Sequence, residues 1–574
     1  MNTRNSLFSV QVIYALCLLI FSVIIHGCHT NTAPIKTENE PRNVGPDLTV
    51  LPPPGQIPES VPPVTPPNVQ HAQHALVVAI NQYKYADGLH LTNLNGTVND
   101  AYLLRDALRS AQVQLPDERV LLDTNATRAA FMQAWQNLLA QAQPGDTLIL
   151  TFSGHGGQQT DTVPLGEKDH KDETLLFHDF NPQQPTQGRI TDDELYDLFK
   201  KASDYQIIFI VDACHSSGMV RSGAKPSGKI RYGGFWNIQP ISPPSLQSGR
   251  LIQEDSGKPL PHVTLITAVE YDQLLVQETV INGKWHGALS WYFVKALKGD
   301  ADGNQNGFLE RSELNRFLQV KVRNEMNYMQ TPKLVPSQEK SVIKLPSGLA
   351  TPSPALRSNF PNIVVLVENA PVPSGLKHAR FVSSPQGIDL RFVVTNRWTD
   401  VFNNTGDKLI TLPSNMLKLW QPVIDKARLL KALATQFDMR LTPIRITLRE
   451  GDGLHKETEI LHFNIEPGDK QQSLNALTLF NLTGDGKLQF VYPLIHFGHP
   501  KVVRNFPYTL SMEVAPPFGG DNLVAVLCKK PATGLHTLLA EIQPNIPEPE
   551  QILSQFRQDN NRCQVGQYAF FSSE

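Results

Sequence analysis

The sequence has no run of lysine or arginine residues, and its charge is nearly balanced. It contains 51 Lys and Arg against 54 Asp and Glu, for a formal net charge of −3. Proteins that bind nucleic acids gather basic residues into a patch or tail, so this distribution gives no indication of a nucleic-acid partner. Hydrophobic residues make up 40% of the chain. That is an ordinary globular composition, and 574 residues allow two or three domains.

Cysteine is also scarce, with five residues in the whole chain. Cys17 lies in an apolar N-terminal segment and Cys28 follows that segment, while Cys214 lies beside polar residues in the middle of the chain. Cys528 and Cys563 lie near the C-terminus, where an oxidising compartment would allow them to pair. We favour a disulfide over two buried thiols, although the sequence does not show that the two Cα atoms are close enough.

Charged side chains are absent from residues 7–25, and Arg4 precedes this apolar segment. Such a segment is either the core of a signal peptide or a single membrane span. The residues that follow resemble the bacterial lipobox, with Ile25 at the branched aliphatic position, a small Gly27, and then Cys28. The alternative is an uncleaved anchor in which the cysteine is incidental.

The lipobox resemblance implies that residues 1–27 are removed and that Cys28 is lipidated. We therefore expect a lipid-anchored protein of the bacterial cell envelope that faces the periplasm. The residue after the cysteine is His29 and not aspartate, which favours the outer membrane in Gram-negative relatives.

Eleven prolines and no hydrophobic periodicity mark residues 29–72. We interpret residues 28–72 as an extended tether rich in polyproline II, which at about 3.1 Å per residue spans on the order of 100 Å. The domains that follow are expected at 73–348 and 349–574.

Short apolar segments alternate with helical patterns in residues 73–345. The alternation predicts an α/β fold in which a mostly parallel sheet is covered by helices on both faces. The predicted strands are 74–81, 119–123, 146–153, 207–212 and 262–269, and the helices are 99–110 and 127–143.

Two polar motifs follow two of these strands. One is Ser-Gly-His-Gly-Gly around His155, and the other is Asp-Ala-Cys-His-Ser-Ser-Gly around Cys214. Parallel sheets place their chemistry at the carboxyl ends of strands, so both motifs belong to one edge. Either residue alone is better explained as a loop histidine or a small buried thiol. Together, in small-residue loops, they indicate a nucleophile with its acid–base partner.

These two motifs resemble the signature of caspase-fold cysteine peptidases, in particular the bacterial metacaspase-like branch. The resemblance covers roughly residues 74–345, and Gln330-Thr331-Pro332 matches an element near the end of such domains. It implies that Cys214 is the nucleophile, that His155 protonates the leaving amine, and that the amides of Gly156 and Cys214 form the oxyanion hole. No cofactor is implied for this chemistry.

Acidic residues near the motifs indicate which substrate the site prefers. Asp212 lies two residues before Cys214, where a carboxylate would slow the thiol unless it binds a cation. Asp100 and Ser153 match further positions that line the first substrate pocket of metacaspases. Together these residues imply a protein or peptide substrate cleaved after Arg or Lys. For Asp100, stabilisation of a helix start is an equal alternative.

Residues 302–313 fit the pattern of an EF-hand calcium loop, with helical segments on both sides. Only two certain anionic ligands are present, so we expect weak Ca²⁺ binding, with a polar turn as the alternative. The candidate ligands are Asp302, Asn304, Asn306, Phe308 through its carbonyl, and Glu313.

Asp192 and Asp193 resemble the acidic pair through which metacaspases bind an activating Ca²⁺. Asp169 or Asp172 could join this pair. However, Arg221 stands where a further acidic residue is expected, and helix N-capping by Asp192 explains the pair nearly as well.

Residues 221–260 are rich in Gly, Pro and Ser. In the family that the chain resembles, the large and small subunit regions meet here. If the enzyme prefers a basic P1 residue, this segment is a candidate for self-cleavage; if it does not, the segment is only a flexible one. Its basic residues include Lys225, Lys229, Arg231, Arg250 and Lys258.

Alternating apolar and polar residues indicate a β-rich accessory domain after residue 360, without a catalytic constellation. One helix is expected, at 416–437, and a hairpin turns at Asp485-Gly486. The predicted strands are 363–368, 389–395, 460–465, 477–482, 487–492, 511–514 and 523–527.

Three functions remain open at this point. The favoured one is a monomeric cysteine endopeptidase. The second is a catalytically silent caspase-fold scaffold that binds partners through its β-rich domain, and the third is another cysteine hydrolase on an α/β sheet.

Overall fold

The structure, a computed structural model, describes most of the unit Val69–Glu574. The predicted signal peptide, Cys28 and all but the last two residues of the predicted tether lie outside the described residues. No helix within the described ranges is long and apolar enough to span a membrane. The segments that are not described are 1–70, 89–90, 161–170, 215–227, 239–259, 270–274, 328, 337–338, 347–359, 361, 415, 435–443, 469–473, 495–497, 500–501 and 556–562.

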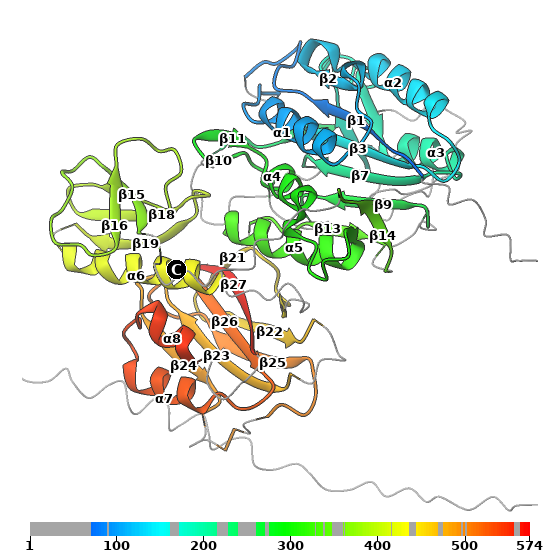
Figure 1. The fold of residues 1–574 in the computed structure, drawn as a ribbon. Coiled ribbons are helices and arrows are strands. Elements are labelled where there is room, and N and C mark those ends of the chain that lie inside the picture. The colour runs from blue at the N-terminus through cyan, green and yellow to red at the C-terminus, as the bar shows by residue number, and fades with distance from the viewer. Residues whose placement is uncertain are drawn as a thin grey trace, which may run out of the picture. The chain divides into compact units, whose positions relative to one another are not determined.

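A six-stranded sheet with the order β13-β9-β7-β3-β1-β2 is the centre of the first half (Figure 1). Its first five strands along the chain pair in parallel, and only β13 is antiparallel. This confirms the predicted mostly parallel sheet, and the five predicted strands are its parallel members. The strands are β1 (Gln73–Ala79), β2 (Val120–Leu122), β3 (Thr147–Ser153), β7 (Gln206–Asp212), β9 (Val263–Thr267) and β13 (Lys333–Val335).

Helices cover both faces of this sheet because the strand residues that point to either face are apolar. In β1, Leu76 and Val78 pack into one core, whereas Ala75 and Val77 pack into the other. This is the pattern of a parallel sheet buried on both faces. One face carries α1 (Thr97–Ser110), α4 (Ala288–Lys295) and α5 (Arg311–Glu325), and the other carries α2 (Arg128–Gln141) and α3 (Asp192–Lys201).

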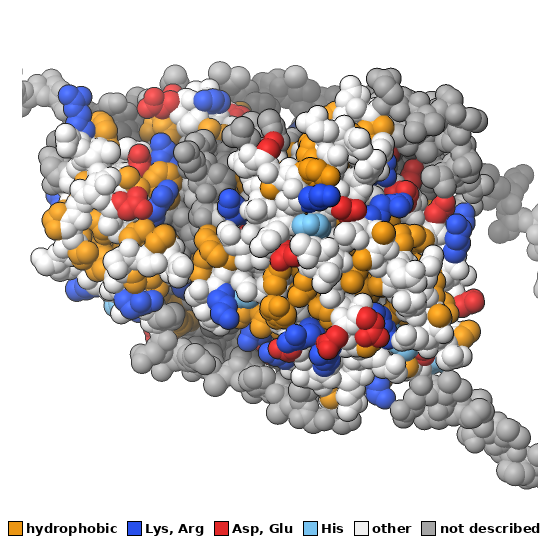
Figure 2. Space-filling model, turned by 90° about the horizontal axis from the view of Figure 1, so that it is seen from above, with side chains coloured by type: hydrophobic (Ala, Val, Ile, Leu, Met, Phe, Trp, Pro, Cys, Tyr) orange, Lys and Arg blue, Asp and Glu red, His pale blue; other side chains and the backbone are white. Residues whose placement is uncertain are grey.

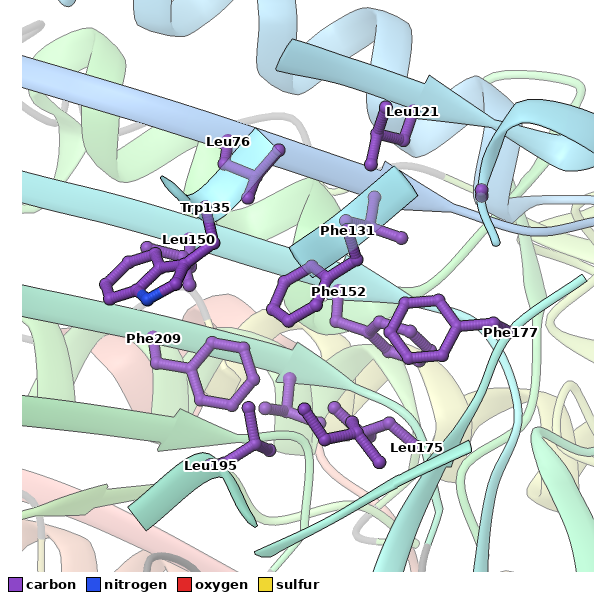
Figure 3. Packing of buried hydrophobic residues seen from close by; sticks show 14 of the residues in the cluster. Leu76, Leu121, Phe131, Trp135, Leu150, Phe152, Leu175, Phe177, Leu195 and Phe209 are labelled. Atoms are coloured by element: carbon purple, nitrogen blue, oxygen red, sulfur yellow. The ribbon is translucent and has the colours of Figure 1, made fainter. Parts of the chain in front are cut away.

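Aromatic side chains fill the core beneath α2. Figure 3 shows Phe131 and Trp135 of α2 among the strand residues Leu76, Leu150 and Phe209. All five side chains are almost fully buried. Apolar burial of this kind stabilises the sheet from which the polar strand ends project.

A second sheet, with the order β6-β5-β4-β8, lies next to the predicted site and was not predicted. Strand β4 begins at Gly156, one residue after His155, and pairs in parallel with β8. The strands are β4 (Gly156–Thr160), β5 (Lys171–Leu176), β6 (Arg189–Thr191) and β8 (Tyr232–Trp236). Two strand pairs complete this half: β10 (Thr279–Ile281) with β11 (Lys284–His286), and β12 (Phe308–Glu310) with β14 (Ser341–Lys344). Short 3-10 turns occupy η2 (Asp117–Arg119) and η3 (Asp123–Asn125), and a π turn occupies η4 (Ala296–Asp300).

The C-terminal part is β-rich, as predicted, and contains three sheets with the orders β16-β15-β17-β18-β19, β20-β22-β25 and β21-β27-β26-β23-β24. The predicted hairpin is present, since β23 and β24 pair and Gly486 adopts a φ of 78° in the turn. The strands are β15 (Ile363–Glu368), β16 (Ala379–Val382), β17 (Leu390–Val394), β18 (Trp398–Asn403), β19 (Lys408–Pro413), β20 (Arg445–Leu448), β21 (Leu454–Lys456), β22 (Ile460–Glu466), β23 (Ala476–Leu482), β24 (Leu488–Tyr492), β25 (Tyr508–Glu513), β26 (Gly520–Cys528) and β27 (Cys563–Ser573).

The prediction of a single helix in this part was wrong. Besides η5 (Leu417–Leu419) and α6 (Trp420–Ala434), the chain forms α7 (Thr533–Ile542) and α8 (Pro549–Gln555). The last two helices have ten and seven residues. Segments of that length carry two or three helical turns, too few for a 3.6-residue period to stand out among strands.

Basic and acidic side chains are interspersed on the face drawn in Figure 2. No continuous patch of one sign is visible there among the described residues.

A disulfide joins Cys528 of β26 to Cys563 of β27, two residues that face each other in the antiparallel pair. The bond spans 35 residues of sequence. Closing a loop of that length stabilises a fold by about 4 kcal/mol in the chain-entropy treatment. Replacing both cysteines with serine should therefore lower the melting temperature of the C-terminal sheets, and reductant should lower it in the parent protein but not in the variant. Equal melting temperatures in oxidising buffer would contradict this expectation.

Candidate active site

The two predicted motifs meet at the carboxyl edge of the central sheet. Strand β3 ends at Ser153 and β7 ends at Asp212, and these two residues are direct partners in the parallel register. His155 and Cys214 each follow two residues later. The register of two adjacent strands therefore brings the histidine and the cysteine to one place.

Hydrogen bonds on two sides hold His155 in position. Its Nε2 lies 2.7 Å from the carbonyl oxygen of Thr92, which can only accept, so Nε2 carries the proton. Its main-chain N–H donates to the Tyr83 hydroxyl at 2.7 Å, and the two rings lie 4.8 Å apart. Because Nε2 is engaged by Thr92, Nδ1 is the nitrogen left to accept and return a proton.

Burial lowers the pKa of His155 to about 4, and the charge of Arg231 acts in the same direction against the hydrogen bond to Thr92. The imidazole is therefore neutral at pH 7 while Arg231 is in place. A neutral imidazole is the form that can take a proton from a thiol.

The depressed pKa of His155 predicts how stability depends on pH. The unfolded state binds the proton near pH 6.5 and the folded state only near 4, so stability is lost as pH falls through this window. In a Cys214→Ala background, lowering the pH from 7 to 4.5 should reduce the free energy of unfolding. The reduction should be about 2–3 kcal/mol larger in the protein with His155 than in the His155→Gln variant. Denaturant unfolding at both pH values measures this difference. Equal losses in the two proteins would contradict the neutral, buried histidine.

Two main-chain amides converge on one carbonyl oxygen beside Cys214. The N–H of Gly156 and the N–H of Cys214 both donate to the carbonyl of Arg231, at 3.0 and 3.1 Å. These are the two amides that the sequence predicted for an oxyanion hole. Cys214 and His155 are both fully buried, and the Arg231 carbonyl lies against the amides beside them.

The side chain of Arg231 occupies the predicted acidic pocket. Its Nη2 donates to Asp100 Oδ2 at 2.8 Å, and its Nη1 donates to the Ser153 hydroxyl at 2.8 Å. Nη1 also lies 3.1 Å from Asp212 Oδ1. All four side chains are buried. The three residues predicted for substrate binding therefore form one pocket, and an arginine fills it.

Glu278 adds a third carboxylate that the sequence did not predict. Its Oε1 lies 3.6 Å from Arg231 Nη2 and accepts from the Gly96 amide at 2.6 Å. Gly287 closes the pocket, since a Cβ built there would lie 2.1 Å from Asp212 Oδ2 and 2.5 Å from Arg231 Nη1. The pocket thus has room for a guanidinium only because residue 287 is glycine.

The charges in the pocket favour a cationic occupant. Burial raises the pKa of Asp212 and of Glu278, and the guanidinium of Arg231 opposes both rises. Burial also disfavours the charge of Arg231 itself, but Asp212, Asp100 and Glu278 outweigh this and raise its pKa. One buried cation faces three buried carboxylates, so removing it would leave the carboxylates uncompensated.

The residues that sequence reasoning missed share a physical reason. Thr92 contributes only a carbonyl oxygen, which any residue possesses, so no sequence signal marks it. Tyr83 and Glu278 reach the site from loops and strand starts distant in sequence. No apolar–polar alternation marks Glu278, which lies just before β10.

The predicted EF-hand loop lies between α4 and α5, as expected. Asp302 accepts hydrogen bonds from the amides of Asn306 and Gly307, and Glu313 accepts from those of Gly303 and Asn304. Both carboxylates thus turn toward the loop backbone. Among the described residues no group of three or more His, Cys, Asp or Glu could hold a metal ion. Glu310, a third carboxylate of the loop, accepts from the side chains of Asn304 and Asn306. An oxygen-rich loop with Asp302 and Glu313 as candidate anionic ligands is the donor set of a weak Ca²⁺ site.

Asp192 and Asp193 form the start of α3 and are largely buried. The N-cap is Thr191, whose side chain and that of Glu194 form a capping box. The alternative that made Asp192 the N-cap was therefore wrong by one residue. Acidic residues in a first turn interact favourably with the helix dipole. Asp172 lies on β5, and Asp169 and Arg221 lie outside the described residues.

Known proteins are similar to the part of the chain that contains this site. Residues 72–343 match the family model described as the caspase domain of the C14 peptidases. The chain carries a caspase domain. The match covers His155, Cys214 and every residue of the acidic pocket, whereas the C-terminal sheets lie outside it.

The caspase domain is related to metacaspases. It is 33% identical over 151 residues to metacaspase-1 of Eremothecium gossypii, a match that covers 25% of this chain and 31% of that protein. For metacaspase-2 of Arabidopsis thaliana the identity is 28% over 245 residues, covering 41% and 54%. The chain thus spans about a third to a half of these relatives. A solved structure from Geobacter sulfurreducens aligns at 23% identity with a TM-score of 0.31, covering 46% of this chain and 92% of that one.

Proposed function

We propose that the protein is a cysteine endopeptidase that hydrolyses peptide bonds after Arg or Lys through Cys214 and His155. The seating of Arg231 is the observation that supports this most. Its carbonyl oxygen accepts from the Gly156 and Cys214 amides while its guanidinium contacts Asp100 and Ser153. This is the arrangement that a P1 arginine would need.

In the proposed reaction, His155 takes the thiol proton from Cys214, and the sulfur attacks the scissile carbonyl carbon. The amides of Gly156 and Cys214 donate to the oxygen on which negative charge develops. The imidazolium of His155 then protonates the leaving amine. Water adds to the thioester with His155 as base, which frees the new carboxylate and restores the thiol.

Hydrolysis of peptides that differ only at P1 tests this function. We expect the protein to cleave Arg and Lys peptides, and Asp peptides at least about 10²-fold more slowly, because a pocket of buried carboxylates repels another carboxylate. Cys214→Ala is the control. If neither the parent protein nor an Arg231→Ala variant cleaves any peptide, the silent scaffold is favoured instead. A scaffold is also compatible with a pocket that Arg231 fills.

We further propose that Ca²⁺ binds the loop at Asp302 and Glu313. Calorimetric titration of the Cys214→Ala protein with CaCl₂, beside the same protein with Asp302→Asn, tests this. A saturable binding heat in the protein with Asp302, and none in the Asp302→Asn variant, would support the site. Identical titration curves for the two proteins would contradict it.

We also propose that Cys28 carries lipid and tethers the protein to the bacterial envelope through residues 29–72. The apolar segment 7–25 and the Ile25-Gly27-Cys28 pattern support this. Cys28→Ala should move the protein from the membrane to the soluble fraction. Retention in the membrane would favour an uncleaved anchor.

A further inference from the structure

The turn between β18 and β19 is buried, which is unusual for the tip of a hairpin. Asn403 is 5% exposed, and Thr405 and Asp407 are fully buried. Hairpin tips normally lie at the surface, because a buried loop would carry polar groups that water cannot satisfy. Another part of the chain therefore covers residues 403–407, which we call the docking turn.

Asn403 gives the docking turn its shape. Its Oδ1 accepts from the main-chain amides of Thr405 and Asp407, at 3.1 and 2.8 Å, and its Nδ2 donates to Asp407 Oδ2 at 3.2 Å. Gly406 adopts a φ of 92°, a left-handed conformation that favours glycine. Bonds from an asparagine side chain to the backbone that follows fix a turn locally. The turn is thus held by its own bonds, and the carbonyl of Thr405 bonds outside it.

The partner of the docking turn is the segment beside the acidic pocket. Gln277 Nε2 donates to the carbonyl of Thr405 at 3.0 Å, and Gln277 is fully buried. The neighbouring residue of the turn makes a second bond, from Asn404 Nδ2 to the carbonyl of Glu325 at the end of α5, at 2.8 Å. The docking turn is therefore bonded to the caspase domain at two points.

Residues 276–278 depend on such a support because they lie outside the central sheet. Gln277 forms an isolated bridge with Ile230, and β10, which follows, belongs to a two-stranded sheet with β11. A sheet of two strands is only marginally stable on its own. Neighbouring side chains of an extended segment point to opposite sides, so the docking turn holds Gln277 from the side opposite Glu278.

Residues 276–278 also border the pocket on which the proposed reaction depends. Glu278 is one of the three pocket carboxylates, with its Oε1 3.6 Å from Arg231 Nη2. The carbonyl of Val276 accepts from the main-chain N–H of Arg231 at 2.8 Å. A P1 arginine in the same pocket would present its N–H to the same carbonyl. Displacing this segment would therefore weaken a charge contact and a main-chain contact of the substrate together.

We propose that the docking turn positions residues 276–278 for substrate binding, with Gln277 as the positioning residue that joins the two. The inference rests on the proposed peptidase function and gives the β-rich part a role in that reaction. The β-rich part then controls how tightly an arginyl substrate binds, without contributing a group to the chemistry.

Hydrogen exchange tests the positioning without catalysis. The full chain with Cys214→Ala is compared with the same chain carrying Gln277→Met or Asn403→Ala, by mass spectrometry of a peptide that contains residues 275–280. Methionine keeps the length of glutamine and removes its donor, so this variant should fold. Loss of one buried hydrogen bond should make exchange at the Glu278 amide about 10-fold faster in both variants. Unchanged exchange in both would overturn the proposal.

Peptide hydrolysis tests the consequence for the substrate. In an Arg231→Ala background, Gln277→Met and Asn403→Ala should each raise KM for an arginyl peptide by about 10-fold. The value of kcat should stay within about twofold, because a displaced segment weakens binding equally in the ground state and the transition state. The double variant should be no worse than the poorer single variant, since both changes break one contact. A loss confined to kcat would overturn the proposal.

Thr478→Val is the matched control. It removes a hydrogen bond of similar length from the same β-rich part, between the buried Thr478 of β23 and His536 of α7 at 2.8 Å. This bond does not involve the docking turn. Exchange at the Glu278 amide and KM for the arginyl peptide should both match the parent protein. A change as large as that of Gln277→Met would show a general loss of stability and overturn the proposal.

The two measurements separate this inference from the proposed function. Faster exchange in Gln277→Met, with no hydrolysis of any peptide by any form, would overturn the peptidase function and leave the positioning of residues 276–278 supported. Hydrolysis of arginyl peptides with the same KM and the same exchange in every form would overturn the inference and leave the peptidase standing.

Discussion

His155→Gln is expected to lower kcat for an arginyl peptide by about 10³-fold, and Cys214→Ala to remove turnover altogether. General acid–base catalysis by one positioned group contributes about 10²–10⁴-fold. The two residues act as a unit, so the double variant should be no worse than Cys214→Ala alone. Because Arg231 fills the pocket, each variant is compared with its parent in an Arg231→Ala background.

The matched control for this histidine is His262→Gln. The Nε2 of His262 also bonds a backbone carbonyl, that of Phe199, at 2.8 Å. However, His262 directly precedes β9, so it lies at the amino end of the strand and away from the carboxyl edge of the sheet. Activity should be unchanged in this control. Wild-type turnover in His155→Gln would contradict the assigned role of the imidazole.

Asp212→Asn should reduce kcat/KM for arginyl peptides by about 10²–10³-fold. Removing one partner of a buried, hydrogen-bonded charge pair costs about 2–5 kcal/mol, and 1.4 kcal/mol corresponds to a factor of ten. Asp100→Asn should act in the same direction, because Asp100 Oδ2 receives Nη2 of the bound arginine at 2.8 Å. Peptides with an uncharged P1 residue should lose far less.

The control for the pocket carboxylates is Asp117→Asn, an exposed aspartate paired with Arg109 at the surface. Surface pairs contribute at most about 1 kcal/mol, so this variant should cleave arginyl peptides like the parent. An equal loss in Asp212→Asn and Asp117→Asn, or improved cleavage after Asp, would contradict the acidic pocket.

The sequence predicted the central sheet well because its strands are continuous apolar segments. The site also required that two adjacent strands end side by side, so that His155 and Cys214 come together. The pairing of Ser153 with Asp212 meets this requirement. The small sheet containing β4 and β8 escaped prediction. Its strands are three to six residues long and include glycines, so neither a period nor β-branched enrichment marks them.

The pocket was only partly predictable. Asp100, Ser153 and Asp212 could be anticipated because they lie beside the motifs or match known positions. Glu278 and the closing glycine, Gly287, come from a segment whose place beside the pocket is set by long-range packing. The sequence placed Arg231 in a candidate self-cleavage segment with several other basic residues. Only the structure distinguishes it, because its carbonyl and guanidinium occupy two parts of the site at once.

Covalent labelling with a peptidyl arginyl chloromethyl ketone tests the central claim most directly. The reagent places an arginine in the pocket and alkylates the nucleophile, with loss of chloride. We predict one adduct, mapped to Cys214, in Arg231→Ala, whose pocket is emptied. The aspartyl reagent should give none, and Cys214→Ala should not react. An arginyl reagent that leaves Cys214 unmodified in a folded protein with an emptied pocket would contradict the account.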